Sequence, residues 1–179
     1  MVGVGDVPWP MVGPTSTSFK PGSPNTKGSM ASTHCTIREA TPSDLSAILH
    51  LYQAAGITAE RAFCLEDAGG QLAKFARYPF YRVFVALSDN AIVGTYEFLL
   101  MDNLAKAGAK SAIVEDVAVD PAVQGKGIGR AMMQHARELA RAHGAYKLAL
   151  SSNQRRQQAH AFYESLGFER HGISFAIEP

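Results

Sequence analysis

The feature that most constrains this chain is a glycine-rich loop between a predicted strand and a strongly amphipathic predicted helix. The loop reads Gln-Gly-Lys-Gly-Ile-Gly-Arg over residues 124–130. Glycine permits positive φ and close approach to a ligand, and the amides of a first helical turn lack partners within the helix. With the positive end of the helix dipole behind them, these amides can bind a phosphate or pyrophosphate. A glycine-rich turn that holds no ligand is the alternative.

Two other phosphate-binding loops fit this stretch less well. A P-loop continues from lysine into serine or threonine, but Lys126 is followed by Gly127. The dinucleotide-binding fingerprint needs a third glycine three residues after the second. Depending on the starting glycine, this chain has Arg130 or Met132 there.

The periodicity of apolar residues predicts alternating strands and helices around the loop. Turn residues at 88–90 join two of the strands into a hairpin. The order of elements favours a mixed sheet with helices on both faces, an α/β (α+β) fold. Strands are predicted over 36–39, 81–87, 91–101, 111–119, 146–150 and 168–177, and helices over 41–55, 59–76 with an interruption near Gly69-Gly70, 127–143 and 155–166.

The first 29 residues differ in composition from the rest. They are rich in proline, glycine, serine and threonine, so they can bury little apolar surface, and we expect them to be flexible. Gly28-Ser29-Met30 is typical of a cloning junction, which favours a vector-derived leader over 1–29 and a single domain over 30–179. A natural disordered tail is the alternative.

Composition excludes several classes of protein. The formal net charge is +1, which provides no basic surface for nucleic acid or an acidic membrane. No apolar run approaches the ~18 residues of a membrane helix. Cys35 and Cys64 have neither metal-site nor redox spacing, so we expect no metal and a reducing, cytoplasmic location.

Two stretches in the second half carry a family resemblance. The first runs from Val114-Glu-Asp-Val-Ala-Val-Asp-Pro121 into the glycine loop, where Gln124, Gly127 and Gly129 hold the defining positions. The second contains Asn153 and, over 159–168, Ala-His-Ala-Phe-Tyr-Glu-Ser-Leu-Gly-Phe. Together they resemble the GNAT superfamily of acetyl-CoA-dependent N-acetyltransferases. The resemblance covers roughly residues 37–177, and weaker phrases resemble its glucosamine-phosphate and aminoalkylphosphonate acetyltransferases.

The resemblance implies a fold, a cosubstrate and its binding residues. It implies one mixed, mostly antiparallel twisted sheet of six to seven strands with about four helices. It also implies that acetyl-CoA is held by loop amides and by strand-like pairing of its pantetheine arm with the backbone near Val117. The residues implied in binding it are Val117, Ala118, Val119, Gln124, Gly125, Lys126, Gly127, Ile128, Gly129, Arg130, Asn153, Ala159, Phe162 and Tyr163.

Direct transfer of acetyl from sulfur to an amine needs a group that assists the leaving thiolate and a group that takes the amine's proton. Tyr163 holds the family position for the first role, and a phenol can protonate or hydrogen-bond a thiolate. Core packing is the alternative for this tyrosine. For the base, Glu97, Glu115 and Asp116 are the candidates, with Glu115 favoured; a structurally paired carboxylate is the alternative. His135 and His160 are expected on helix surfaces.

The acceptor is not specified by these motifs. We expect a primary amine of a small molecule, with a protein or peptide acetyltransferase and a non-catalytic acyl-CoA sensor as alternatives. The resemblance and a sheet that ends in a strand also predict a homodimer formed by pairing or exchange of sheet edges.

Overall fold

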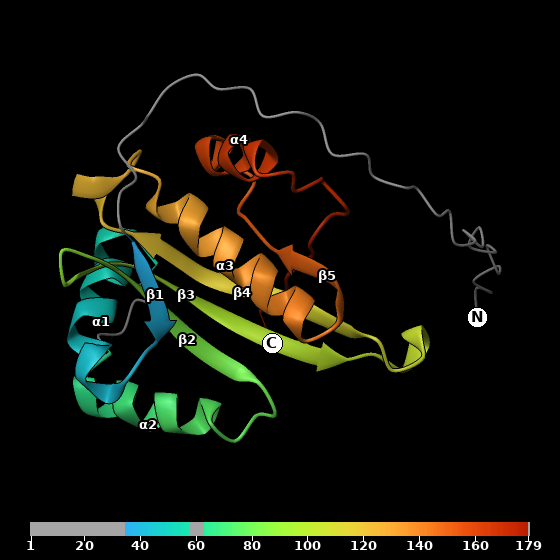
Figure 1. Ribbon diagram of the computed structural model, residues 1–179, viewed down its shortest axis with the longest axis horizontal. Coiled ribbons are helices and arrows are strands. Elements are labelled where there is room, and N and C mark those ends of the chain that lie inside the picture. The colour runs from blue at the N-terminus through green and yellow to red at the C-terminus, as the bar shows by residue number, and fades with distance from the viewer. Residues whose placement is uncertain (1–34, 58–62, 179) are drawn as a thin grey trace. The chain divides into compact units, whose positions relative to one another are not determined.

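The computed structural model describes residues 35–57 and 63–178, and the sheet at its centre is mixed. The strands follow one another across the sheet in chain order (Figure 1). The first four are antiparallel to their neighbours, and the fifth runs parallel to the fourth. The strands are β1 (Thr36–Glu39), β2 (Tyr81–Ser88), β3 (Ala91–Asp102), β4 (Lys110–Val119) and β5 (Ala145–Leu150).

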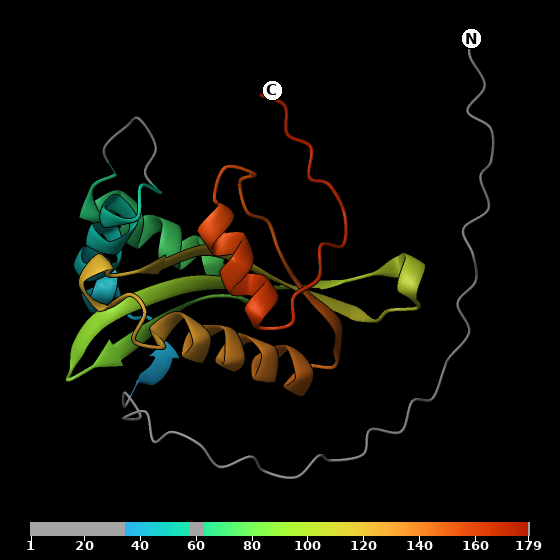
Figure 2. The ribbon, with the colours of Figure 1, turned by 90° about the horizontal axis from the view of Figure 1, so that it is seen from above.

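Helices cover both faces of this sheet, as Figures 1 and 2 show. Side chains alternate along β2, so Val83 and Val85 pack with Ile48 on one face, while Phe84 and Ala86 join the core beneath α3 on the other. The α-helices of the described part are α1 (Leu45–Ala54), α2 (Leu65–Phe75), α3 (Ile128–Ala142) and α4 (Gln157–Ser165).

The helix that follows the glycine loop is held by its apolar stripe. In α3, Ile128, Met132, Ala136 and Ala140 recur at helical spacing and are all buried against the sheet. Burial of a side chain as large as Ile128 or Met132 contributes about 1.5–3 kcal/mol. The first turn of α3, and with it the end of the loop, is therefore fixed firmly over the strands.

Most predicted elements are confirmed, including the hairpin between β2 and β3. Asp89 and Asn90 both have positive φ, +50° and +64°, which is typical of a type I′ turn. The interruption predicted at Gly69-Gly70 is wrong, because α2 runs through both residues. A mid-helix glycine costs only about 1 kcal/mol, which is too little to break a helix that packs on its neighbours. Residues 58–62 of that prediction lie outside the described part.

The strand predicted over 168–177 is also wrong, so the described sheet has five strands rather than six to seven. Apolar residues do alternate in this segment, at Ile173, Phe175 and Ile177, but all three are exposed. The alternation of apolar residues shows which face each side chain would take in a strand. A strand forms, however, only where a neighbouring strand pairs with its backbone groups. Here the chain leaves α4 without meeting one.

No helix in the described ranges has the length and apolarity needed to cross a lipid bilayer. The predicted leader over 1–29 lies outside the residues that the structure describes.

Candidate active site

The site begins where β4 and β5 stop pairing. Their last paired residues are Val114 and Leu150; β5 ends there, whereas β4 continues to Val119. Within the described residues, the second half of β4 therefore pairs only with β3 and leaves one backbone edge free. A free edge of this kind can accept an extended chain through main-chain hydrogen bonds. The predicted cofactor-binding residues Val117, Ala118 and Val119 lie on this stretch.

A pocket of about 440 Å³ opens at the point where the strands part. One wall comes from β4, another from the loop between β5 and α4, and a third from the end of α1. It brings together residues far apart in the chain, Gly56 and Ile57 with Tyr163 among them. The other lining residues are Val114, Glu115, Asp116, Val117, Leu150, Ser151, Ser152, Asn153, Arg155 and Arg156.

The glycine loop has the geometry expected of an anion-binding turn. Gly125 and Gly127 have positive φ, +78° and +88°, a region that disfavours other residues. Gly127 is the N-cap of α3, and the first helical hydrogen bond runs from the Ala131 amide to the Gly127 carbonyl. The amides of residues 128–130 precede that bond, so they remain available to a ligand. Lys126 and Arg130 are exposed beside them.

Two predicted loop residues have structural contacts of their own. The side-chain amide of Gln124 donates to the Val119 carbonyl over 3.2 Å, which ties the loop to the end of β4. A β-carbon added at Gly129 would lie 3.1 Å from Phe162, so glycine at this position lets α4 pack on the start of α3. Phe162 and Ala159 are partly buried in α4. The contacts of Gln124, Gly129 and Phe162 thus help to hold the loop and α4 in place.

Asn153 follows β5 and lines the pocket. Its side-chain oxygen accepts from the Arg155 amide over 2.9 Å, and its carbonyl bonds the His160 imidazole over 3.0 Å. The side-chain oxygen of Asn153 therefore has a structural role in this turn. Binding of a cofactor by this side chain stays a prediction.

The three candidate bases gather at a β-bulge. Glu97 on β3 lies opposite Glu115 on β4, and the register shifts between Thr95 and Glu97. Asp116 sits at the irregularity with φ of +49°, which is uncommon for a residue other than glycine. Strict alternation would send Asp116 to the face opposite Glu115, but both residues line the pocket. The bulge thus concentrates negative charge at one place.

These carboxyl groups differ in exposure and in pKa. Glu97 is 8% exposed, and it accepts hydrogen bonds from the hydroxyls of Tyr81, over 2.5 Å, and Tyr52, over 3.3 Å. Burial raises the pKa of Glu97; the two tyrosine hydrogen bonds oppose that shift, and the charges of Asp116 and Glu115 add to it. Burial, then the charge of Asp116, raises the pKa of Glu115. Glu115 lines the pocket and is exposed, whereas Glu97 is buried and does not line it.

Tyr163 is half-buried and faces the same pocket as Glu115. Its ring packs against Phe162 and Phe168, with centroids 5.2 and 5.7 Å away. Burial raises the pKa of Tyr163; nearby Arg156 lowers it and Glu115 raises it. The phenol therefore stays protonated at neutral pH and is a hydrogen-bond donor beside a carboxylate, which is the pairing that proton transfer in and out of a site requires.

Sequence reasoning missed the two tyrosines that bond Glu97. Tyr52 belongs to the apolar stripe of α1 and Tyr81 begins β2, so neither position carries a local signal of function. The expectation of a surface position was wrong for His135. Its Nδ1 lies 2.6 Å from the hydroxyl of fully buried Tyr96, and its ring also packs on Phe84.

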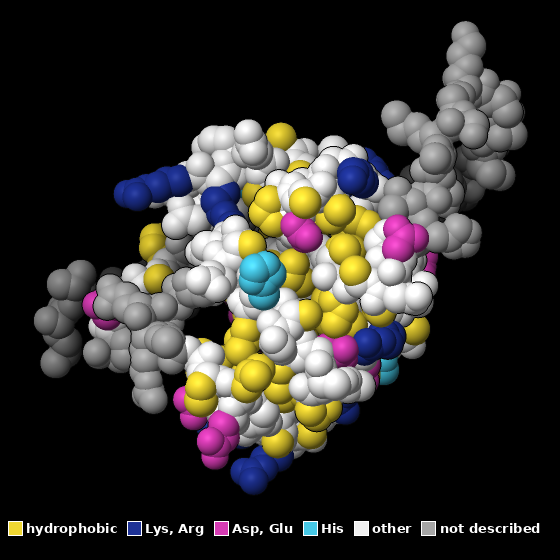
Figure 3. Space-filling view, turned by 90° about the vertical axis from the view of Figure 1, so that its left-hand side faces the viewer, with side chains coloured by type: hydrophobic (Ala, Val, Ile, Leu, Met, Phe, Trp, Pro, Cys, Tyr) yellow, Lys and Arg dark blue, Asp and Glu magenta, His cyan; other side chains and the backbone are white. Residues whose placement is uncertain are grey.

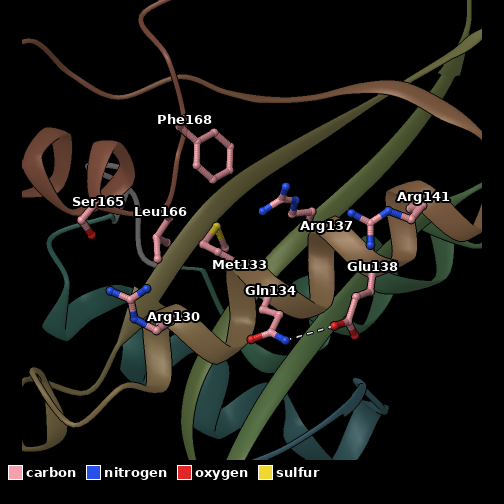
Figure 4. Close-up of a pocket in the computed structure, with 9 residues that line it drawn as sticks. All are labelled: Arg130, Met133, Gln134, Arg137, Glu138, Arg141, Ser165, Leu166 and Phe168. Carbon is pink, nitrogen blue, oxygen red and sulfur yellow. Dashed lines mark hydrogen bonds between the residues drawn. The ribbon is translucent and has the colours of Figure 1, made fainter. Parts of the chain in front are cut away.

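A second pocket, of about 370 Å³, lies along α3 and beside the end of α4. In Figure 4, Gln134 donates to Glu138 on one side of it, and Leu166 and Phe168 approach from the other. Arg130, Arg137 and Arg141 supply its charge. None of the candidate catalytic residues lines this pocket, so we assign the chemistry to the pocket between β4 and β5.

Figure 3 views the end of the molecule that lies at the left in Figure 1. Apolar side chains gather in the middle of this face, with charged side chains mainly around them. Among the described residues seen in this view, lysine and arginine form no continuous band.

Comparison with known proteins agrees with this geometry. The model of the acetyltransferase (GNAT) family matches residues 45–168. The glucosamine 6-phosphate N-acetyltransferase of Trypanosoma brucei brucei is 33% identical over 50% of this chain and 59% of that protein. This chain thus aligns with little more than half of that relative. An aminoglycoside N(6')-acetyltransferase type 1 of Stenotrophomonas maltophilia is 32% identical to this chain, over 75% of this chain and 86% of that protein.

A solved structure from Agrobacterium tumefaciens, described as a candidate acetyltransferase, superposes with a TM-score of 0.74. It is 33% identical, and the match covers 80% of this chain and 99% of that one. The family match spans the parting strands and Tyr163, which line the pocket, and also the glycine loop and α3. The chain therefore belongs to the acetyltransferase (GNAT) family.

Proposed function

We propose that this protein transfers the acetyl group of acetyl-CoA directly to a primary amine of a small molecule. The observation that carries the proposal is that Glu115 and Tyr163 line one pocket, beside a free strand edge. Acetyl-CoA would supply an acetyl group activated as a thioester. Membership of the acetyltransferase family supports this donor.

The residues present fit acetyl-CoA at two places. The amides at the start of α3, with Lys126 and Arg130 beside them, suit the negative charge of its pyrophosphate. The free backbone edge of residues 115–119 suits the amide-rich pantetheine arm, whose peptide-like groups can pair as a strand does. Both features belong to a continuous stretch of chain, so their spacing is set by the end of β4 and by the turn over residues 120–127.

We assign the proton transfers to Glu115 and Tyr163. As the amine nitrogen forms its bond to the acetyl carbon, Glu115 takes the nitrogen's proton, directly or through a water. The carbon–sulfur bond breaks, and Tyr163 donates its hydroxyl hydrogen toward the departing sulfur. Burial and the charge of Asp116 raise the pKa of Glu115, which makes it a stronger base. The carboxylate of Asp116 also attracts a protonated amine, which loses one proton to solvent before the neutral amine attacks.

The acceptor is inferred from the charge of the β4 wall and from the relatives. Glu115 and Asp116 present carboxylates where the amine must approach. Two of the relatives are named for small amines, an amino sugar phosphate and an aminoglycoside. We therefore place a small-molecule amine ahead of a peptide. The free thiols of Cys35 and Cys64 support a cytoplasmic location.

Turnover of acetyl-CoA with a panel of amines tests this function. The panel contains glucosamine 6-phosphate, an aminoglycoside, a diamine and lysine-containing peptides, and thiol release and product mass are measured. We expect at least one small amine to gain an acetyl group. Tight binding of acetyl-CoA with no product from any amine would favour the sensor. Acetylation of peptides alone would favour the protein acetyltransferase.

A further inference from the structure

The second pocket, which we call the arginine groove, carries positive charge that the described part of the chain does not neutralise. Arg130, Arg137 and Arg141 line it, and all three are exposed. Among the described residues, no carboxylate forms an ion pair with any of them. Glu138 also lines the groove, but its carboxylate accepts a hydrogen bond from Gln134 over 3.1 Å. The lining therefore has an excess of two positive charges, against a formal net charge of +1 for the whole chain.

Helical spacing brings two of these arginines together. Arg137 and Arg141 are four residues apart on α3, so their side chains are neighbours and their like charges repel. Figure 4 shows both guanidinium groups directed along α3 toward the start of the helix. A phosphate bound between them would replace this repulsion with charge-assisted hydrogen bonds, which the planar fork of arginine forms well. The pair is therefore arranged to hold a phosphate group.

The rest of the lining includes a floor of apolar side chains. Met133 is buried beneath the groove, and Leu166 and Phe168, at the end of α4, are partly buried. An inorganic ion would leave this floor in water, whereas a flat organic ring would cover it. The groove has a volume of about 370 Å³, within the range of roughly 300–1,000 Å³ that is typical of small-molecule sites.

The arginine groove is separate from the pocket between β4 and β5, because the two have no lining residue in common. Its far half is also distant from the glycine loop. Arg137 and Arg141 lie nine and thirteen residues after Ile128, or about 14 and 20 Å along the helix at about 1.5 Å per residue. The two pockets nevertheless meet at one contact, since the ring of Phe168 packs edge-on against Tyr163 with centroids 5.7 Å apart.

We propose that the arginine groove is a second ligand site, which binds a phosphate monoester that carries a flat apolar ring. Arg137 and Arg141 would hold the phosphate, and the ring would cover the floor of Met133, Leu166 and Phe168. A phosphate monoester is close to a dianion at neutral pH, which matches the excess of two positive charges in the lining. The site lies outside the places assigned to the acetyl donor and the acceptor, and it does not depend on acetyl transfer.

The first test measures binding of adenosine 5′-monophosphate, a probe with both the phosphate and the ring, by calorimetry with and without saturating CoA. We expect about one probe per chain and the same affinity in both conditions, because CoA would fill the glycine loop and not the far half of the groove. Adenosine and inorganic phosphate each lack one part of the probe and should bind at least tenfold more weakly. No binding of the probe, equal binding of inorganic phosphate, or loss of the probe when CoA is present would each overturn the proposal.

The second test locates the probe by charge. Arg137→Gln combined with Arg141→Gln should raise the dissociation constant of the probe at least tenfold and leave affinity for CoA within about twofold. Glu138→Gln removes the negative charge of the lining and should tighten binding of the probe about twofold or more. The matched control is Arg77→Gln, an exposed arginine just after α2, the helix that packs on the opposite face of the sheet.

The control variant should bind the probe as the parent protein does. The altered side chains are all exposed, so each variant should keep the parent's melting temperature. An unchanged affinity for the probe in the double arginine variant, or weaker binding in Glu138→Gln, would show that the probe lies elsewhere and would overturn the assignment.

Discussion

The proposed donor side and the proposed acceptor side of the site are built in different ways. The donor side is a single run of chain, from Val117 to Arg130, and it would bind mainly through backbone amides. The acceptor side would form around Glu115 and Asp116 of β4, near buried Glu97 of β3 and the tyrosines of α1 and β2 that bond it. A site that binds through backbone amides keeps its affinity when side chains change, as long as its glycines are kept. A site that binds through side chains changes its specificity with single substitutions. The first is suited to a constant ligand and the second to a varied one.

The largest effect is expected from a charge placed in the donor loop. Gly127→Asp forces a non-glycine residue to φ of +88° and sets a negative charge against the expected phosphates. The strain displaces the amides of the loop and the charge repels the phosphates, and together these effects should weaken binding by about 3 kcal/mol, so the dissociation constant for acetyl-CoA should rise about a hundredfold or more by calorimetry. Gly144→Asp is the control, since it has φ of +69° but lies beyond the far end of α3. Equal affinity in both variants would remove the loop from the donor side.

The second-largest effect is expected on the acceptor side, where it tests Glu115 as the base. Glu115→Gln keeps the size of the side chain but removes the base, so kcat should fall about a hundredfold while affinity for acetyl-CoA stays within about twofold. The rate of the parent enzyme should rise with pH as Glu115 ionises. Burial and, after it, the charge of Asp116 raise the pKa of Glu115; Asp116→Asn removes only the second cause, so this acid limb should move part of the way to lower pH. Near-normal turnover in Glu115→Gln would move the role of base to Asp116 or Glu97.

A smaller effect is expected where the two sides meet. Tyr163→Phe keeps the ring against Phe162 and Phe168 but removes the hydroxyl, so kcat should fall about tenfold or more with affinity for acetyl-CoA unchanged. Tyr146→Phe, on the exposed part of β5, is the matched loss of a hydroxyl and should leave kcat unchanged. Were Tyr163 only a packing residue, its variant would change the melting temperature and not kcat.

The same contrast explains what could be predicted from sequence. The glycine loop and α3 were predictable because turn chemistry and helical periodicity are local, and here they coincide within some twenty residues. Tyr52 could not be identified, since a tyrosine on an apolar helix stripe usually reports core packing. The position of Asp116 could not either, because one bulged residue reverses what alternation predicts. The segment over residues 168–177 shows a third limit. Its apolar residues do alternate, but a strand forms only beside another strand that can pair with it, and local sequence does not show where such a partner lies.

The separation of β4 from β5 also sets a length. Between Val114, the last residue paired to β5, and the glycine loop, β4 runs for five residues, 115–119, at about 3.3 Å each, or about 16 Å. In the proposed complex, the length of this stretch sets the distance between the phosphate-binding turn and the carboxylates. The side chains of residues 117–119 can be exchanged, but one inserted or deleted residue would shift the proposed position of the reacting carbon by about 3.3 Å and turn every later side chain to the other face. Substitutions at residues 117–119 should therefore be tolerated, whereas insertions and deletions in this segment should not.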